Sequence, residues 1–255
     1  MSSQQTEGAN YRIDLAYDGR AYHGWQRHQG NPTVQGALEG AIESCFGTKS
    51  PAHSSGRTDR GVHANHQVAN VFLPDGLDVE EARTALQAAL PDDIQLLALA
   101  PAPADFHARG DAKNKTYRYI IWNGKDCPDE LDGRAWHIPQ PLNIKAMRPV
   151  CRIFEGVHDF ASFAKKTRTE QKNTNRRIHS IKLEHDPDAP ARIEITIRAD
   201  GFLWKMVRNI VYAIVRVGEG HLTAERLKEV LESTERLTAT GTAPAAGLYL
   251  DRVEY

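Results

Sequence analysis

The sequence has little cysteine, and its cysteines are poorly placed for cross-links or metal binding. The 255 residues include only Cys45, Cys127 and Cys151, which are odd in number and far apart. No Cys-x-x-Cys pair occurs, so neither a disulfide framework nor a cysteine-rich zinc site is expected. Cys45 falls on the apolar face of an expected helix, where a cysteine is typically part of the core.

Long apolar runs are also missing. No segment approaches the roughly 20 residues that a membrane-spanning helix needs, and the longest candidate, Ile210 to Val215, lies between Arg208 and Arg216. Residues 1–10 show no signal-peptide pattern and are expected to form a disordered tail. These absences predict a soluble protein of a reducing compartment, the cytoplasm, without membrane association.

Phosphate-binding loops and metal motifs are absent as well. The chain has neither a GxxxxGK[ST] nor a GxGxxG motif, so a nucleotide cofactor is not expected. His53, His63, His66 and His107 lie near one another in the sequence, but they fit no HExxH-type helix pattern. A metal site is therefore not expected.

Charge of one sign is not in excess, because 32 basic residues face 33 acidic ones. The distribution is nevertheless uneven. One basic stretch runs from Lys165 to Lys182 and contains a single acid, Glu170; a second runs from Arg109 to Arg118 and includes Tyr117. A lone charge run is typical of a solvated face, whereas two basic stretches beside aromatic residues leave an anionic polymer as an equal alternative.

Hydrophobic periodicity predicts a mixed order of strands and helices. Strands are expected at 11–17, 67–73, 94–99, 116–122, 178–185, 192–198 and near 248–253. Helices are expected at 34–45, 79–90, 144–154, 203–217 and 223–231. Thr33 is the expected N-cap of the first of these helices, and Gly47 is expected to end it. This order favours an α+β fold with a largely antiparallel sheet. The two similar parts, 11–124 and 134–255, suggest two fused ferredoxin-like halves, with linker candidates at 124–133 and 165–175.

The stretch from Gly56 to His63 is the most unusual in the chain. It places Asp59 between Arg57 and Arg60, inside a loop bracketed by glycines. Nearby positive charge favours the ionised carboxylate, which can act as a nucleophile or base. The alternative is a surface loop whose aspartate caps a neighbouring turn.

Two further residues have open interpretations. Arg208 interrupts an apolar helix pattern, so it lies either at the solvent edge of the helix or against a buried carboxylate, for which Asp59 is the best candidate by type. Tyr117 lies between Lys115 and Arg118 in an expected strand. It is either ordinary sheet packing or a platform on which a base stacks.

Together these segments resemble one family, the TruA-type tRNA pseudouridine synthases, from about residue 11 to the end of the chain. The matching motifs are Tyr17-Asp18-Gly19, Gly24-Trp25-Gln26, Thr33-Val34-Gln35-Gly36, Gly56-Arg57-Thr58-Asp59, Gly61-Val62-His63-Ala64, Gln67-Val68, Phe106-His107-Ala108-Arg109, Tyr117-Arg118-Tyr119, Gly156-Val157-His158-Asp159-Phe160, Phe202-Leu203, Met206-Val207-Arg208-Asn209-Ile210 and Ala243-Pro244-Ala245-Ala246-Gly247-Leu248.

The resemblance implies the pseudouridine synthase fold, with the halves joined around a central cleft, and an isomerase (an intramolecular transferase) that needs no cofactor. It implies a homodimer whose substrate is tRNA, at uridines 38, 39 and 40 of the anticodon stem-loop. By motif match, Asp59 corresponds to the catalytic aspartate, which attacks the ribose C1′ or assists formation of a glycal. Tyr117 corresponds to the tyrosine that stacks on the base and can act as a general base. Arg208 corresponds to the ion-pair partner of that aspartate, Arg57 to the base-flipping arginine and Leu248 to a pocket-lining residue.

The remaining expected substrate contacts are basic: Arg60, Arg109, Lys165, Lys166 and Arg168. Arg60 departs from the family, which usually has a small residue after the catalytic aspartate. Tyr212 also departs, because it replaces a common glycine, and it is expected to alter helix packing. The alternatives are a non-catalytic tRNA-binding or RNA-folding protein, a synthase for another uridine, or a hydrolase that uses Asp59.

Overall fold

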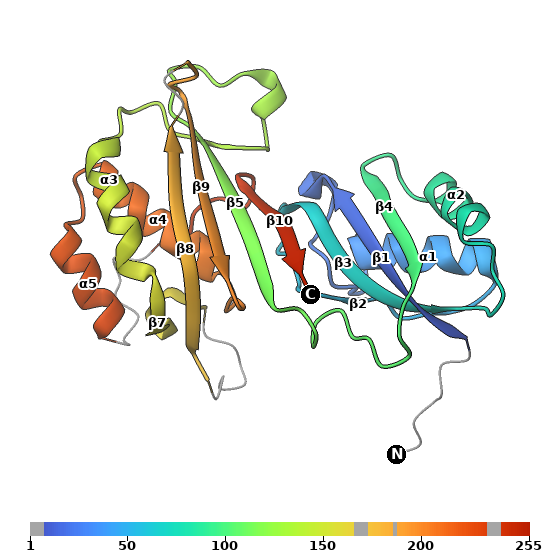
Figure 1. Ribbon diagram of the computed structural model, residues 1–255. Helices are drawn as coiled ribbons and strands as arrows, with labels where there is room; N and C mark the ends of the chain where they lie inside the picture. Colours follow the sequence, from blue (N-terminus) through green and yellow to red (C-terminus); the bar gives the residue numbers. More distant parts are fainter. Residues whose placement is uncertain (1–7, 166–172, 186–187, 234–240) are drawn as a thin grey trace. The chain divides into compact units, whose positions relative to one another are not determined.

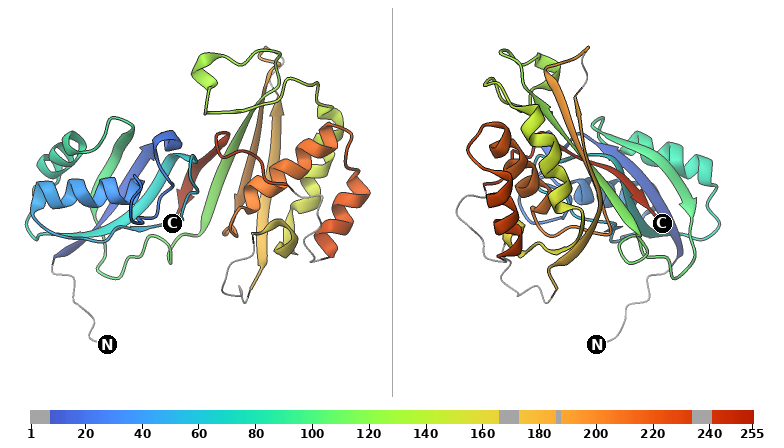
Figure 2. Two further views of the ribbon diagram at one scale, coloured as in Figure 1. Left: turned by 180° about the vertical axis from the view of Figure 1, so that it is seen from behind. Right: turned by 60° about the vertical axis from the view of Figure 1, so that its left-hand side comes forward.

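The computed structural model describes residues 8–165, 173–185, 188–233 and 241–255. It divides into two compact units. The first ends at Lys113 and also contains Leu250–Tyr255, and the second is Asn114–Tyr249. In each unit, helices cover one face of a mainly antiparallel sheet (Figure 1, Figure 2). The predicted α+β class is confirmed. The segment 124–133, expected as a linker, lies inside the second unit.

The sheet of the first unit has the strand order β4-β1-β3-β10. These strands are β1 (Ala9–Tyr17), β3 (His63–Leu73), β4 (Ile94–Pro101) and β10 (Leu248–Glu254), and the short β2 (His53–Ser54) pairs with β3. The helices are α1 (Val34–Phe46), α2 (Val79–Ala89) and the 3-10 turn η1 (Gly19–Ala21). Alternate residues of β1 are buried, as the sequence predicts for a half-buried strand.

The sheet of the second unit has the strand order β5-β9-β8-β7. These strands are β5 (Asn114–Trp122), β7 (Gly156–Asp159), β8 (Asn175–His185) and β9 (Arg192–Ala199), and the short β6 (Trp136–His137) runs parallel to β5. The helices are α3 (Ile144–Val150), α4 (Met206–Gly218) and α5 (Ala224–Glu232), with 3-10 turns η2 (Asp129–Leu131), η3 (Cys151–Phe154) and η4 (Ala161–Phe163). The predicted hairpin of β8 and β9 is confirmed.

Helix boundaries follow local chemistry. The Thr33 hydroxyl accepts a hydrogen bond from Gly36 N at 3.2 Å, and Gly47 ends α1 in the left-handed conformation, as predicted. The helix predicted at 203–217 begins only at Met206, because Lys205 adopts φ 63°. The helix predicted at 144–154 ends at Val150 and continues as a 3-10 turn after Pro149.

Two other expectations are corrected. Strand β1 begins at Ala9, so the last two residues of the expected tail belong to the sheet; the buried Asn10 amide donates to Pro103 O and Phe106 O, which satisfies its polar group. Residues 1–7 lie outside the described residues. Cys45 is half-buried rather than core, and its thiol faces Ala85 O at 3.5 Å. No helix in the described part of the chain combines the length and apolar character that crossing a bilayer requires.

Candidate active site

The Asp59 loop connects β2 to β3, and backbone hydrogen bonds hold it against the segment 22–25. Trp25 N donates to Thr58 O at 3.1 Å, and Gly61 N donates to Tyr22 O at 3.2 Å. Gly24 has φ +93°, and a Cβ there would lie 2.5 Å from Thr58 O. Only glycine permits this approach, which explains why Gly24-Trp25 belongs to the same set of motifs as the Asp59 loop.

A turn closes the loop beyond Asp59. Val62 N donates to Asp59 O at 3.1 Å, so the aspartate begins a tight turn that leads into β3. Behind the turn, a Cβ on Gly19 would lie 2.1 Å from Val62 O. The buried His63 accepts a hydrogen bond from Gly19 N at 3.1 Å through Nδ1. The Asp18-Gly19 segment therefore supports the end of the loop that follows Asp59.

A buried polar network supports the beginning of the loop. The Tyr17 hydroxyl lies 2.9 Å from Thr58 Oγ1, and Gln67 Nε2 donates to Gly56 O at 2.8 Å. The Ser55 hydroxyl donates to Gln67 Oε1 at 2.7 Å. The four side chains are buried, so their polar groups must be satisfied by one another and by the backbone. Burial raises the pKa of Tyr17 to about 12, so its phenol is neutral at physiological pH.

The loop exposes its charged side chains to different degrees. Asp59 is half-buried, whereas Arg57 and Arg60 are exposed. Desolvation lowers the pKa of His23, and the positive charges of Arg60 and His28 lower it further, so Arg60 contributes to the field on this side of the loop. A carboxylate on a rigid backbone next to exposed arginines can act on a polyanionic substrate.

Tyr117 lies in β5 of the second unit, opposite Ile197 of β9. Its ring is 8% exposed and meets the edge of Phe202 at 5.0 Å between centroids, with the two planes at 89°. Phe202 was not predicted as a site residue, although it belongs to the quoted Phe202-Leu203 motif. Its contact fixes the plane of the Tyr117 ring, which a stacking role requires.

Arg208 lies in the first turn of α4 and is half-buried. Its Nε donates to Ala243 O at 2.7 Å, and Ala243 N donates back to Arg208 O at 3.2 Å. The next carbonyl, Pro244 O, accepts from the Tyr119 hydroxyl at 2.7 Å. The segment 243–248 therefore links α4 to β5 and orients the Arg208 side chain. Burial raises the pKa of Tyr119, and the nearby charge of Arg208 opposes that rise.

The same segment explains Gly247 and places Leu248. Ile120 N donates to Gly247 O at 2.8 Å, and a Cβ on Gly247 would lie 2.6 Å from both Ile120 O and the Tyr119 ring. Glycine is therefore required there by close packing. Leu248 follows as the first residue of β10 and is 6% exposed, as expected for an apolar lining residue.

Tyr212, a departure from the family pattern, has a structural explanation. Its ring stacks on Trp136 with centroids 6.1 Å apart and planes at 4°. A Cβ on Gly241 would lie 2.4 Å from the Tyr212 ring, so the glycine makes room for the tyrosine. Tyr212 therefore packs against Trp136 and the segment at Gly241.

The predicted substrate contacts belong to two groups. Asp59, Arg57, Arg60 and Arg109 lie in the first unit; Tyr117, Lys165, Arg208 and Leu248 lie in the second. Arg109 is exposed on the loop after β4, and its N–H donates to His107 Nδ1. Lys165 is exposed, with Nζ 4.4 Å from the centroid of Trp204. Lys166 and Arg168 lie outside the described residues.

The four histidines lie in different local environments and do not form one cluster in the described part of the chain. His66 Nδ1 accepts from Val253 N at 3.2 Å, and its Nε2 lies 2.9 Å from an Asp14 oxygen. Burial alone would raise the pKa of Asp14, but hydrogen bonds from His66 and Arg12 outweigh it and lower that pKa. His53 and His107 face one another at 5.7 Å between ring centroids. Within the residues that the structure describes, no three His, Cys, Asp or Glu side chains gather as a metal-binding group.

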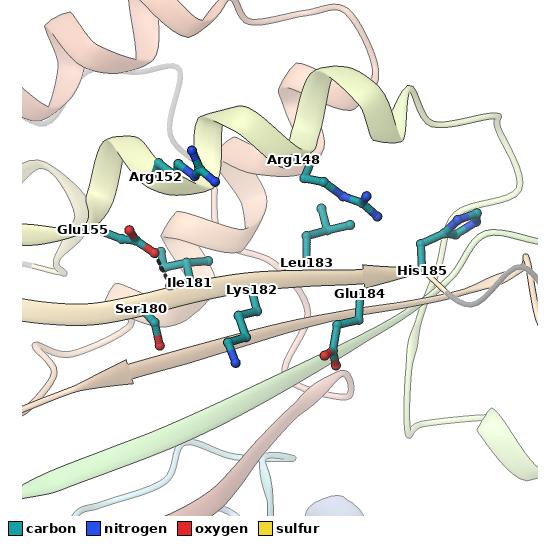
Figure 3. A pocket seen from close by; sticks show the side chains of 9 residues that line it. All are labelled: Arg148, Arg152, Glu155, Ser180, Ile181, Lys182, Leu183, Glu184 and His185. Atoms are coloured by element: carbon teal, nitrogen blue, oxygen red, sulfur yellow. Dashed lines mark hydrogen bonds between the residues drawn. The ribbon is translucent and has the colours of Figure 1, made fainter.

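A groove lies beside β8 in the second unit, lined by residues of α3, η3 and that strand (Figure 3). Glu155, the residue after η3, reaches β8, where its carboxylate accepts from Ile181 N at 2.9 Å. Arg148 and Lys182 are among the other lining residues. None of the residues that line this groove is among the site residues predicted from the sequence. The Glu155 carboxylate in the groove is already bonded to a backbone N–H of β8.

Comparison with known proteins connects these features. A family model described as tRNA pseudouridine synthase matches residues 15–111 and 150–255. A protein of Methylacidiphilum infernorum named tRNA pseudouridine synthase A is 40% identical over 246 residues, covering 96% of this chain and 95% of that protein. A protein of the same name from Bacillus sp. strain KSM-64 is 39% identical over 247 residues, covering 96% of this chain and 99% of that protein.

A solved structure of a Cbf5-Nop10-Gar1 complex is also similar, at 13% identity and a TM-score of 0.32. The match covers 80% of this chain and 54% of that one. At that score it adds nothing to the comparison by sequence.

Proposed function

The chain belongs to the tRNA pseudouridine synthase family, and we propose that it converts uridines 38, 39 and 40 in the anticodon stem-loop of tRNA, with Asp59 as the catalytic carboxylate. The isomerisation of uridine to pseudouridine in tRNA is the activity of this family. The observation that carries the proposal is the Asp59 loop: backbone bonds and a buried network hold it, while the carboxylate is only half-buried.

The reaction breaks the bond between N1 of uracil and C1′ of the ribose. In one route the Asp59 carboxylate attacks C1′ as uracil leaves with the electron pair of that bond. In the other route Asp59 assists an elimination that gives a glycal. In the first route the Asp59–C1′ bond breaks when the rotated base attacks C1′ through C5. In the second route the elimination removes the C2′ proton, which returns to C2′ as C5 bonds to C1′. In both routes C5 then loses its proton and N1 gains one, so no atom is lost overall. A nearby carboxylate stabilises the positive charge that develops at C1′ when this bond breaks.

The other site residues have supporting roles in this proposal. The Tyr117 ring stacks on the target uracil, because Phe202 holds that ring in a fixed plane. The Tyr117 hydroxyl also acts as the general base. Arg208 pairs with Asp59, and the hydrogen bond to Ala243 O orients its guanidinium for that role. Arg57 is exposed and helps to expel the base from its stack, a step that costs a few kcal/mol. Leu248 lines the pocket.

We further propose that RNA is held by basic side chains of both units and that the working enzyme is a cytoplasmic homodimer without a nucleotide cofactor. The exposed contacts are Arg60, Arg109 and Lys165. Lys166 and Arg168 belong to the same proposal by sequence alone. Phosphate contacts of this kind fix the register of an RNA without reading its sequence, so a dimer would gather modest local charge into a longer basic surface.

The test uses unmodified tRNA transcripts that carry a single uridine at 38, 39 or 40. Each transcript is incubated with the protein without added metal or nucleotide, and pseudouridine is mapped by chemical labelling and primer extension. Conversion at these positions is the expected result. Conversion at another position only would replace the proposed target, and binding without any conversion would favour a non-catalytic RNA-binding protein.

A further inference from the structure

Trp204 is unusual among the large apolar side chains because it is exposed. In the described part of the chain only Leu97, Val157 and Trp204 have this property, and Trp204 is 40% exposed. The other tryptophans are buried or half-buried. A single exposed apolar side chain is ordinary on a protein surface, so the case for Trp204 depends on its position and its neighbours.

The position of Trp204 connects it to the site residues of its own unit. It lies on the loop between β9 and α4, two residues after Phe202, which contacts Tyr117. It also precedes Arg208 by four residues. Leu203 is buried, whereas Trp204 is exposed. One short loop therefore supports Tyr117, leads into the helix of Arg208 and presents an indole to solvent.

The charge of Lys165 lies beside this indole. Lys165 N donates to Trp204 O at 2.9 Å, and its Nζ lies 4.4 Å from the centroid of the ring. The next residue, Lys205, has φ 63°, and among the described residues it is the one non-glycine residue with positive φ. Strain of this kind persists where the surrounding structure requires a particular backbone path. Here it lies between the exposed indole and the first turn of α4.

We propose that Trp204 is a stacking platform for an unpaired base of the bound tRNA, other than the uridine being converted, and that Lys165 contacts the neighbouring phosphate. This proposal rests on the proposed function, because it assumes that the second unit binds tRNA near Tyr117 and Arg208. Aromatic side chains with adjacent cations are the usual means of holding unstacked bases. Stacking also tolerates any base, because every base has a π-face.

The proposed contacts of Trp204 and Lys165 affect tRNA affinity and its salt dependence differently. Stacking contributes about 1–3 kcal/mol per base by alanine substitution, which corresponds to a loss of affinity of about 5- to 150-fold. It releases no counterions, so the salt dependence of binding stays as it is. A phosphate contact adds about 0.7 to 0.9 to the slope of log K against log salt. The indole and the ammonium can therefore be tested separately.

The experiment measures Kd for an unmodified tRNA transcript at several salt concentrations, together with kcat and KM. The variants are Trp204→Ala, Trp204→Phe, Lys165→Met and, as a matched exposed apolar control in the same unit, Val157→Ala. We expect Trp204→Ala to weaken binding about tenfold or more with an unchanged salt slope. Trp204→Phe and Val157→Ala should remain within about threefold of the wild type. Lys165→Met should reduce the slope by about one.

Fluorescence provides a second readout that does not depend on the alanine variant folding. Base stacking should quench Trp204, so tRNA should quench the wild type more than Trp204→Phe. If the wild type converts tRNA, then equal quenching in the wild type and Trp204→Phe would overturn the proposal that Trp204 stacks on a base. An unchanged Kd for Trp204→Ala would overturn it too. An equal loss of affinity in Val157→Ala would overturn it as well. Failure of the wild type to bind or convert any tRNA would instead refute the proposed function.

Discussion

Tyr17→Phe removes a single oxygen from beneath the Asp59 loop and is the most selective test of how that loop is held. The Tyr17 hydroxyl lies 2.9 Å from Thr58 Oγ1, and both side chains are buried. The ring itself, which lies 6.4 Å from the Trp25 ring between centroids, remains in place. The variant therefore removes the contact with Thr58 and a longer hydrogen bond from Gln67 Nε2 at 3.5 Å, and it leaves the apolar packing unchanged.

The magnitude follows from that contact. A net hydrogen bond contributes about 0.5–1.5 kcal/mol, and a buried hydroxyl left without its partner costs about 1–3 kcal/mol. We expect a loss of about 2 kcal/mol in the free energy of unfolding, which lowers Tm by about 4–8 °C in a chain of this size. Because a displacement of about 1 Å at a reacting group can cost about 100-fold, we expect kcat to fall about tenfold, with KM changed less than threefold.

The assay is single-turnover conversion of a tRNA transcript, measured beside thermal unfolding. The control is Tyr255→Phe, which removes a hydroxyl bonded to Ala108 O at 2.6 Å in the same unit. It should lower Tm similarly and leave kcat unchanged. Two results would refute the reasoning: an unchanged kcat in Tyr17→Phe despite a lower Tm, or an equal loss of kcat in Tyr255→Phe.

Three other predictions concern stability, reactivity and the arginine of α4. Because burial raises the pKa of Tyr17 to about 12, its unfolded form ionises first. The contribution of Tyr17 to the free energy of unfolding should therefore fall by about 2 kcal/mol between pH 10 and 12, and urea titrations should show a fall that is smaller by that amount in Tyr17→Phe. Burial, with the nearby Glu155 charge, raises the pKa of Cys151 to about 11, so mass spectrometry at pH 8 should find Cys151 alkylated far more slowly than the half-buried Cys45; equal rates would contradict its burial. Arg208→Lys removes the 2.7 Å bond to Ala243 O and should lower kcat about 100-fold with tRNA affinity nearly unchanged, whereas a pure binding defect would exclude a positioning role.

The sequence predicted most elements because apolar periodicity and caps are local signals. Thr33 and Gly47 bound α1 as expected, and alternation in residues 11–17 identified β1. Where the predicted helix start or burial was wrong, a backbone conformation or a contact between distant parts of the chain determined the observed structure. Lys205 adopts a left-handed conformation that delays α4, and no side-chain pattern indicates that conformation in a lysine. Cys45 fits an apolar helix face, yet α2 covers that face only in part, leaving the thiol half-buried.

The sequence names the candidate site residues but not the contacts that support them. Asp59 stood out because an acid between arginines in a glycine-bracketed loop is unusual. The network beneath it was missed, because Tyr17 of β1 is far from Thr58 in the sequence. Tyr17 reaches Thr58, and Gln67 of β3 reaches Gly56 O, in a fold where β1 pairs with β3. Gln67 at a buried strand position was the available signal, since a buried amide needs partners. Phe202 and Trp204 were missed for a related reason: each acts through a contact across the fold.

The most direct measurement compares wild type with Asp59→Ala on the single-uridine transcripts, recording pseudouridine formation and tRNA affinity in the same samples. If Asp59 is the catalytic carboxylate, Asp59→Ala abolishes conversion at every position and binds tRNA with near wild-type affinity. Conversion by Asp59→Ala at the wild-type rate would contradict the assignment of Asp59 as the residue that acts on the ribose.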